Sequence, residues 1–128
     1  MQPRFTDSNG NIIYVARKKS EHEDTKKKYY NLKCIQKTFE NTSPAKIFKE
    51  IKIMSGLHHA NIVKLHEVIE SKDSINIAME LCSGGNIADY IAKSGPFTEK
   101  QSQKILKSCL EAVDYMHKNL IFHRNLNT

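Results

Sequence analysis

The sequence contains no tryptophan, only three cysteines and no long apolar run, and each shortage excludes a class of protein. Cys34, Cys82 and Cys109 are odd in number and widely spaced, which argues against a disulfide framework and a cysteine-ligated zinc site. No apolar stretch approaches the roughly 18 residues of a membrane span. The first residues also lack the apolar segment of a secretory signal. We therefore expect an intracellular protein, cytoplasmic or nuclear, that does not enter a membrane.

The charge is unevenly balanced: 20 Lys and Arg stand against 14 Asp and Glu, a net charge of +6. A basic chain can bind nucleic acid or anionic lipid. Here the lysines are scattered and aromatic residues make up only 8% of the chain, so solvated surface explains most of the charge better. We rank a nucleic-acid-binding module last among the functions considered. The length of 128 residues is that of a single domain.

Four segments have the apolar and β-branched pattern of strands. They are residues 12–16, 29–35, 61–69 and 75–81, of which the last alternates most clearly. The stretch 17–28 has no apolar residue and is interpreted as an exposed loop. A phosphate-binding basic patch is the alternative for this stretch, but the acidic residues among its lysines disfavour it.

Helix signals occupy the remainder of the chain. Ser43 and Pro44 predict a helix start, and an apolar stripe follows at Ile47, Ile51, Met54 and Leu57. A short helix is expected over 86–92, ending near Ser94, Gly95 and Pro96. The sequence from Thr98 to Gln101 is a capping box that opens a long helix over 98–118, with one apolar face at Ile105, Cys109, Val113 and Met116. Strands mixed with helices in this order predict an α+β fold.

Two charged residues occupy positions where the pattern expects apolar side chains. Lys33 lies within the second predicted strand, and Glu50 falls on the apolar arc of the first helix. Burying either charge alone is costly, so one interpretation pairs Lys33 with Glu50 across a strand–helix interface. In the other interpretation Lys33 extends from an edge strand to solvent while Glu50 lies at the rim of the stripe.

Five segments, in this order and spacing, resemble the beginning of a eukaryotic-type protein kinase domain. The segments are Tyr30-Asn31-Leu32-Lys33, Lys49-Glu50-Ile51-Lys52-Ile53-Met54, Leu57-His58-His59-Ala60-Asn61-Ile62-Val63-Lys64-Leu65, Ile77-Ala78-Met79-Glu80-Leu81-Cys82-Ser83-Gly84-Gly85, and Tyr115-Met116-His117 followed by Phe122-His123-Arg124-Asn125-Leu126. The sequences of these segments are most similar to those of serine/threonine kinases of the calmodulin-dependent and AMP-activated type. The resemblance implies a small lobe over residues 1–81, an antiparallel sheet plus one helix, and a hinge with the first helices of a truncated large lobe over 82–128.

The resemblance also implies an ATP site. Lys33 would hold the α- and β-phosphates, and Glu50 would orient Lys33. Met79 would lie at the back of the adenine pocket and limit its depth. The Glu80 carbonyl and the Cys82 amide would bond the adenine edge, and Ile13 would form part of the roof.

The phosphate and adenine contacts of the family pattern are weakened in this sequence. The glycines of the phosphate loop fall on Thr6, Ser8 and Asn11, and Gly10 is out of register by one residue. Side chains there would keep the backbone amides from closing over phosphates. Asn31 stands where the family has a small apolar residue against adenine. We therefore expect weak ATP binding.

The transfer machinery departs further from the family pattern. Asn125 occupies the position of the catalytic aspartate, and an amide cannot accept the proton of a substrate hydroxyl. Asn127 replaces the lysine that helps to neutralise the transferred phosphate. The residues up to Thr128 include no counterpart of the family's magnesium ligands, so Mg²⁺ is not expected to be held by this chain.

The leading hypothesis is a catalytically defective, pseudokinase-like domain that binds a nucleotide or a partner. The alternative is a portion of an active ATP-dependent serine/threonine kinase whose remainder lies outside this chain. Without a complete large lobe, part of the apolar face of the 98–118 helix would be exposed, which predicts a protein partner or self-association. A metal site formed by His58, His59 and His66 is disfavoured, because no acid or cysteine stands at a ligand-like spacing, and we expect structural roles for these histidines.

Overall fold

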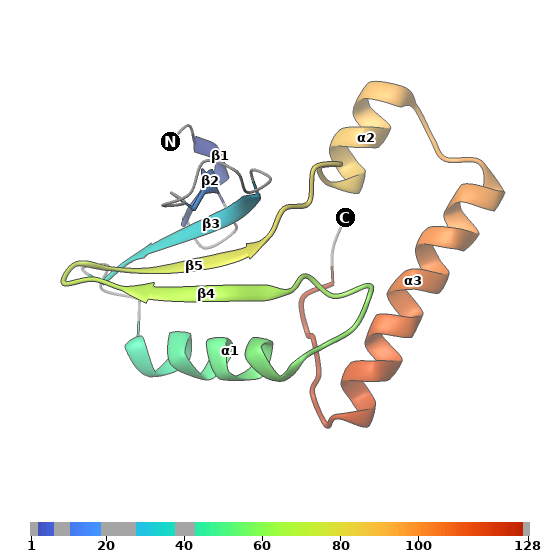
Figure 1. Ribbon diagram of the computed structural model, residues 1–128. Helices are drawn as coiled ribbons and strands as arrows, with labels where there is room; N and C mark the ends of the chain where they lie inside the picture. Colours follow the sequence, from blue (N-terminus) through green and yellow to red (C-terminus); the bar gives the residue numbers. More distant parts are fainter. Residues whose placement is uncertain (1–2, 7–10, 19–27, 38–42, 127–128) are drawn as a thin grey trace. The chain divides into compact units, whose positions relative to one another are not determined.

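A computed structural model describes residues 3–6, 11–18, 28–37 and 43–126 of the chain, and it has the mixed α+β architecture that the sequence predicts (Figure 1). The elements follow one another as β1 (Pro3–Thr6), β2 (Ile12–Arg17), β3 (Tyr29–Gln36), α1 (Pro44–Gly56), β4 (Leu65–Glu70), β5 (Ser74–Glu80), α2 (Ile87–Ser94) and α3 (Glu99–Lys118).

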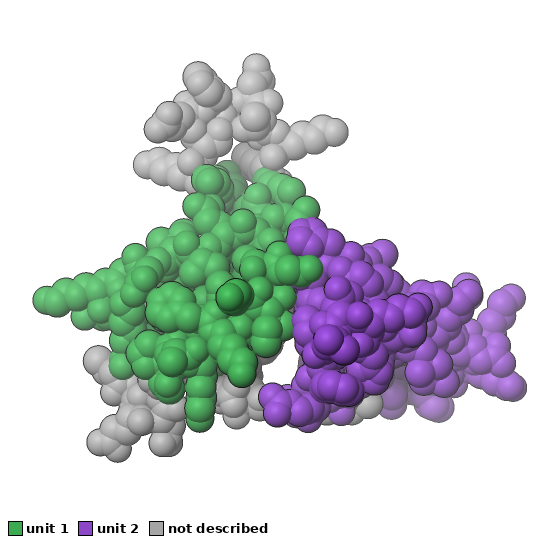
Figure 2. Space-filling model, turned by 90° about the horizontal axis from the view of Figure 1, so that it is seen from below, with its two compact units in different colours: residues 1–56, 64–81 green, residues 57–63, 82–128 purple. Residues whose placement is uncertain are grey.

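These elements form two compact units, coloured separately in Figure 2. The first unit consists of residues 1–56 and 64–81 and contains the sheet with α1. The second consists of residues 57–63 and 82–128 and contains α2 and α3. The lobe assignment to 1–81 and 82–128 stays a prediction.

The sheet of the first unit has five antiparallel strands in the order β1-β2-β3-β5-β4. Strand β3 lies at the centre, where Lys33 pairs with Ile13 of β2 on one side and with Ile77 of β5 on the other. Residues directly opposite one another share a face of the sheet, and so do residues two apart along a strand. Asn31 and its partner Met79 therefore belong to the same face as Lys33.

The apolar core lies between this face and α1, which runs along the sheet in Figure 1. The buried members of the core are Ile35, Ile47, Ile75 and Ile77, and the side chains packed against them are Ile51, Leu65, Val68 and Met79. Ile75 and Ile77 are almost completely inaccessible, at 0% and 1% exposure. The predicted stripe of α1 is confirmed by Ile47 and Ile51, and this packing holds Glu50 beside the sheet.

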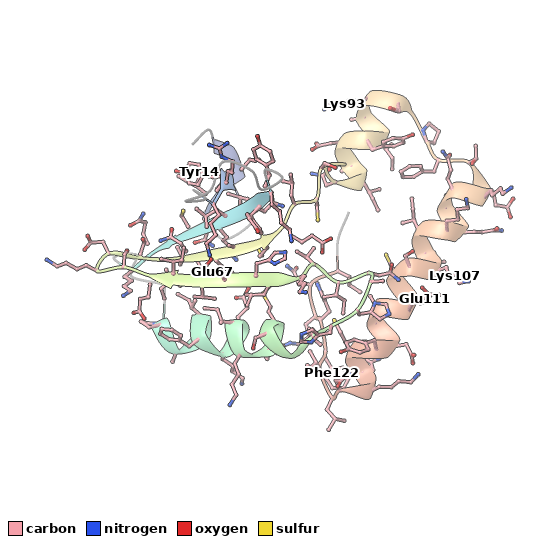
Figure 3. The ribbon with its side chains drawn as sticks, viewed as in Figure 1. Tyr14, Glu67, Lys93, Lys107, Glu111 and Phe122 are labelled. Atoms are coloured by element: carbon pink, nitrogen blue, oxygen red, sulfur yellow. The ribbon has the colours of Figure 1, made fainter. Side chains whose placement is uncertain are left out.

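In the second unit, the segment before β4 is attached to α3. The His58 amide donates to the Tyr115 hydroxyl at 3.1 Å, and the His59 ring lies 5.1 Å from the Tyr115 ring. One helical turn away, the Asn61 side chain donates to Glu111 at 3.0 Å. Glu111 also lies 3.9 Å from Lys107 on the same side of α3 (Figure 3).

The helix ends agree with their sequence signals. Thr98 and Gln101 form the capping box of α3: the Thr98 amide donates to the Gln101 side chain at 2.9 Å, and the Gln101 amide donates to the Thr98 hydroxyl at 3.4 Å. Asn119 caps the other end. The Asn86 side chain accepts from the Asp89 amide at 2.7 Å, so the short helix α2 begins as expected, and it ends at Ser94, near the predicted stop.

The structure differs from the sequence prediction at two strands. Strand β1 is additional, because a four-residue segment with proline and arginine has no strand pattern of its own and is defined by pairing with β2. Strand β4 begins at Leu65 rather than at residue 61, because a turn in which the Ile62 amide donates to the His59 carbonyl at 3.1 Å precedes it. Cys109 of α3 is exposed, in agreement with the expectation that part of the apolar face of this helix is exposed. Residues 19–27 of the predicted loop lie outside the described residues.

Candidate functional site

The predicted pairing of Lys33 with Glu50 is confirmed. Lys33 Nζ lies 3.8 Å from Glu50 Oε1, with the lysine on β3 and the glutamate on α1. The two side chains differ in environment, since Lys33 is 13% exposed and Glu50 is 55% exposed. The pairing is thus that of the first interpretation, whereas the position of Glu50 at the rim is that of the alternative; Lys33 does not lie on an edge strand. The Glu50 backbone borders the core, but the long side chain keeps its carboxylate at the rim, where water reaches it.

Two predicted site residues, Ile13 and Met79, share a face of the first unit's sheet with Lys33. Ile13 lies directly across from Lys33 on β2 and is 7% exposed. Met79 packs against the core from β5, opposite Asn31. Lys33 thus lies on a face made mainly of apolar side chains, with its ammonium group 3.8 Å from the Glu50 carboxylate. A cation in such a setting is suited to an anionic ligand such as a phosphate group.

Glu80 ends strand β5 and is held by Lys64. Its amide donates to the Lys64 carbonyl at 2.8 Å, and its carboxylate accepts from the Lys64 amide at 3.3 Å. Its own carbonyl accepts a hydrogen bond from Asn31 Nδ2 at 3.4 Å. The sequence marked Asn31 as a departure from the family pattern, but it contained no signal for this contact. Cys82, two residues further along, is exposed and belongs to the second unit.

Asn125 follows α3 in the second unit and is exposed. Its backbone amide donates to His123 Nδ1 at 3.3 Å, so His123 supports the backbone at Asn125. Arg124, between them, has a φ of 62°, in the left-handed region that L-residues seldom occupy. The backbone just before Asn125 therefore has an unusual conformation, and the hydrogen bond between His123 and Asn125 spans it.

Only two of the predicted phosphate-loop positions, Thr6 and Asn11, lie among the described residues. Thr6 is exposed and pairs with Ile12 across the β1–β2 hairpin, and Asn11 is half-buried. Ser8 and Gly10 lie outside the described residues.

Other reactive or ligand-forming side chains are dispersed. No group of three histidine, cysteine, aspartate or glutamate residues that could hold a metal ion occurs in the described part of the chain. His59 contacts Tyr115, whereas His66 contacts Tyr30 with ring centres 5.0 Å apart, in the other unit. Burial raises the pKa of the Cys34 thiol. Among the described helices, none has the length and apolar character to span a membrane.

Comparison with known proteins relates this chain to protein kinases. Residues 13–128 match the family described as the protein kinase domain. The chain is 36% identical over 120 residues to serine/threonine-protein kinase SIK1 of Rattus norvegicus, covering 93% of this chain and 15% of that protein. It is 37% identical over 97 residues to calcium/calmodulin-dependent protein kinase type 1 of Caenorhabditis briggsae, covering 76% and 27%.

A solved structure is also similar. The crystal structure of Rad53 1-466 in complex with AMP-PNP superimposes with a TM-score of 0.82 at 25% identity, covering 98% of this chain and 31% of that one. The chain belongs to the protein kinase domain family, as its sequence indicated. It spans less than a third of the length of these relatives.

Proposed function

We propose that this chain binds ATP weakly and does not transfer phosphate, which would make it a pseudokinase-like nucleotide-binding or partner-binding domain. The observation that best supports an ATP site is the Lys33–Glu50 pair, whose charged atoms lie 3.8 Å apart. Lys33 shares its face of the sheet with Ile13 and Met79. In the proposed site Lys33 contacts the phosphates and Glu50 orients it. Met79 and Ile13 border the base, and the Glu80 carbonyl faces its edge. A bond from the Cys82 amide stays an expectation of the family resemblance.

The proposal of a catalytic defect rests on Asn125. Phosphoryl transfer to a hydroxyl uses a carboxylate that orients the hydroxyl and accepts its proton, and a neutral amide lacks this capacity. Loss of a general base typically costs about 10²- to 10⁴-fold in rate. Weak nucleotide binding would follow from the side chains at Thr6 and Asn11, where the family has glycines. No step that requires Mg²⁺ is assigned to this chain.

Titration calorimetry with ATP, in the presence and absence of Mg²⁺, tests the site. We expect saturable binding by the natural sequence and its loss in Lys33→Ala. Lys37→Ala is the matched control, because Lys37 follows β3 directly but pairs with Glu70 at 2.7 Å. If neither the natural chain nor the control binds millimolar ATP while both are folded, the proposed nucleotide site is refuted.

The second candidate is a portion of an active serine/threonine kinase. It is favoured by relatives that are named as kinases and that extend well beyond the span of this chain. Phosphate transfer to a serine peptide, measured for a chain extended by its downstream sequence, separates the two candidates. Activity in the extended protein that Asn125→Asp raises by less than about tenfold would favour an active enzyme over the defective domain.

We also propose that the exposed face of the 98–118 helix mediates self-association or binds a protein partner within the cell. Leu106 and Leu110, one turn apart on α3, are each 59% exposed. Sedimentation over a range of concentrations tests self-association, and Leu106→Ser/Leu110→Ser should shift any oligomer toward monomer. A chain that stays monomeric throughout would leave a different protein as the partner.

A further inference from the structure

Asn31 is the one buried polar residue in the described part of the chain, at 8% exposure. It lies two positions before Lys33 on β3, on the face that packs against α1. Burying an amide is costly unless its polar atoms find hydrogen-bond partners. The described part of the chain contains no buried side-chain nitrogen or oxygen without such a partner, so the fold accommodates this amide specifically.

One hydrogen bond of the Asn31 side chain goes to the end of the neighbouring strand. In the β3–β5 register Asn31 lies opposite Met79, and its side chain reaches one residue further, to the Glu80 carbonyl. Nδ2 lies 3.4 Å from that oxygen. A carbonyl oxygen can only accept, so the amide must present its nitrogen to Glu80.

This contact affects the nucleotide site proposed above, and the inference rests on that proposal. There, the Glu80 carbonyl is the acceptor for the 6-amino group of adenine. The Asn31 amide already donates to this oxygen, so a 6-amino group must either share it or displace the amide. Displacement would leave a buried amide without this partner, and sharing would bring two N–H donors together.

We propose that Asn31 is a specificity-determining residue that withholds the Glu80 carbonyl from adenine. It lowers the affinity for ATP and removes most of the preference for a 6-amino purine over a 6-oxo purine. A 6-oxo purine presents an acceptor at this position and therefore has no use for the Glu80 carbonyl. The site then binds purine nucleotides of both kinds weakly and without strong selection.

The test compares ATP with inosine triphosphate, whose purine carries an oxo group at position 6. Calorimetric titration of the full chain gives the dissociation constant of each nucleotide for the natural sequence and for Asn31→Ala. We expect Asn31→Ala to bind ATP about three- to tenfold more tightly, the worth of one net hydrogen bond. Inosine triphosphate should change by less than about twofold. The ratio is the decisive quantity, because extra space left by the smaller side chain would help both nucleotides.

Asn76→Ala is the matched control. Asn76 is a half-buried asparagine on β5 whose Nδ2 donates to the Ser74 hydroxyl at 3.1 Å. It neighbours Ile77 along the strand and so points to the opposite face of the sheet. Its removal should leave the ratio unchanged. Asn31→Ser provides a second variant that keeps a polar group but removes the amide, and thermal melting checks that every variant is folded.

The outcomes separate the two proposals. If the natural chain binds ATP and the Asn31 variants leave the ratio of the two dissociation constants unchanged, the role of Asn31 is refuted and the nucleotide site stands. If no folded variant binds ATP at millimolar concentration, both proposals are refuted. Lys33→Ala added to Asn31→Ala should abolish the gained ATP affinity, which would assign the gain to the site beside Lys33.

Discussion

The ion pair between Lys33 and Glu50 should contribute modestly to stability, and its energy can be worked from its geometry. Two unit charges about 4 Å apart interact by about 1 kcal/mol in water and by about 4 kcal/mol at an effective dielectric constant of about 20. The observed separation is 3.8 Å, but the Glu50 side chain is 55% exposed, so solvent screening favours the lower value. We expect a coupling energy of about 1 kcal/mol.

A double-mutant cycle measures this coupling. Urea unfolding of the natural chain, Lys33→Met, Glu50→Gln and the double variant gives the pairwise free energy directly. The coupling should fall toward zero at about 1 M salt, where the screening length is about 3 Å. A coupling of about 3 kcal/mol or more that salt leaves unchanged would refute the reasoning, because it would indicate a pair shielded from water.

A surface pair provides the comparison. Lys118 and Asp114 lie one turn apart on α3, 2.7 Å from each other, with side chains 72% and 63% exposed. Although these charges are closer together, both are well hydrated, so their cycle should give only about 0.3–0.5 kcal/mol. A coupling larger than that of Lys33 and Glu50 would mean that distance outweighs burial in this protein.

The remaining predictions concern the core, a helix cap and a thiol. Ile77→Ala should lower the free energy of unfolding by about 2–5 kcal/mol because Ile77 is 1% exposed, whereas Ile69→Ala, at a residue 50% exposed, should cost far less in the same urea titration. Thr98→Ala should destabilise the chain by about 1 kcal/mol through loss of the α3 capping box, and Thr98→Ser should restore it. Because burial raises the pKa of Cys34, less of it is thiolate at mildly alkaline pH, so mass spectrometry should find it alkylated more slowly than the exposed Cys82; equal rates would contradict this.

Local signals in the sequence predicted most of the elements because each signal acts over a few residues. The Thr98–Gln101 capping box and the stripe of α1 depend on hydrogen bonds and packing periods that are visible in a short window. The same locality explains the failures. Strand β1 is defined by its pairing with β2, and the start of β4 is delayed by a turn at His59 and Ile62, neither of which a local pattern reveals.

The residues of the candidate site and the Lys33–Glu50 pair could be predicted from the sequence, but the hydrogen bond of Asn31 could not. Lys33 and Glu50 could be singled out because charges interrupt two apolar patterns, and the family resemblance assigned them a role. The hydrogen bond from Asn31 to the Glu80 carbonyl could not be predicted, because it joins residues 49 positions apart through the register of β3 and β5.

The sequence by itself determined the order of most elements, the α+β class and the membership of the protein kinase domain family, because these depend on residue types and their spacing. Only the tertiary structure decided how buried each charge of the ion pair is, and which backbone oxygen accepts a hydrogen bond from the Asn31 amide. Burial and hydrogen bonding depend on which surfaces meet when strands and helix pack. A linear pattern contains no measure of that contact.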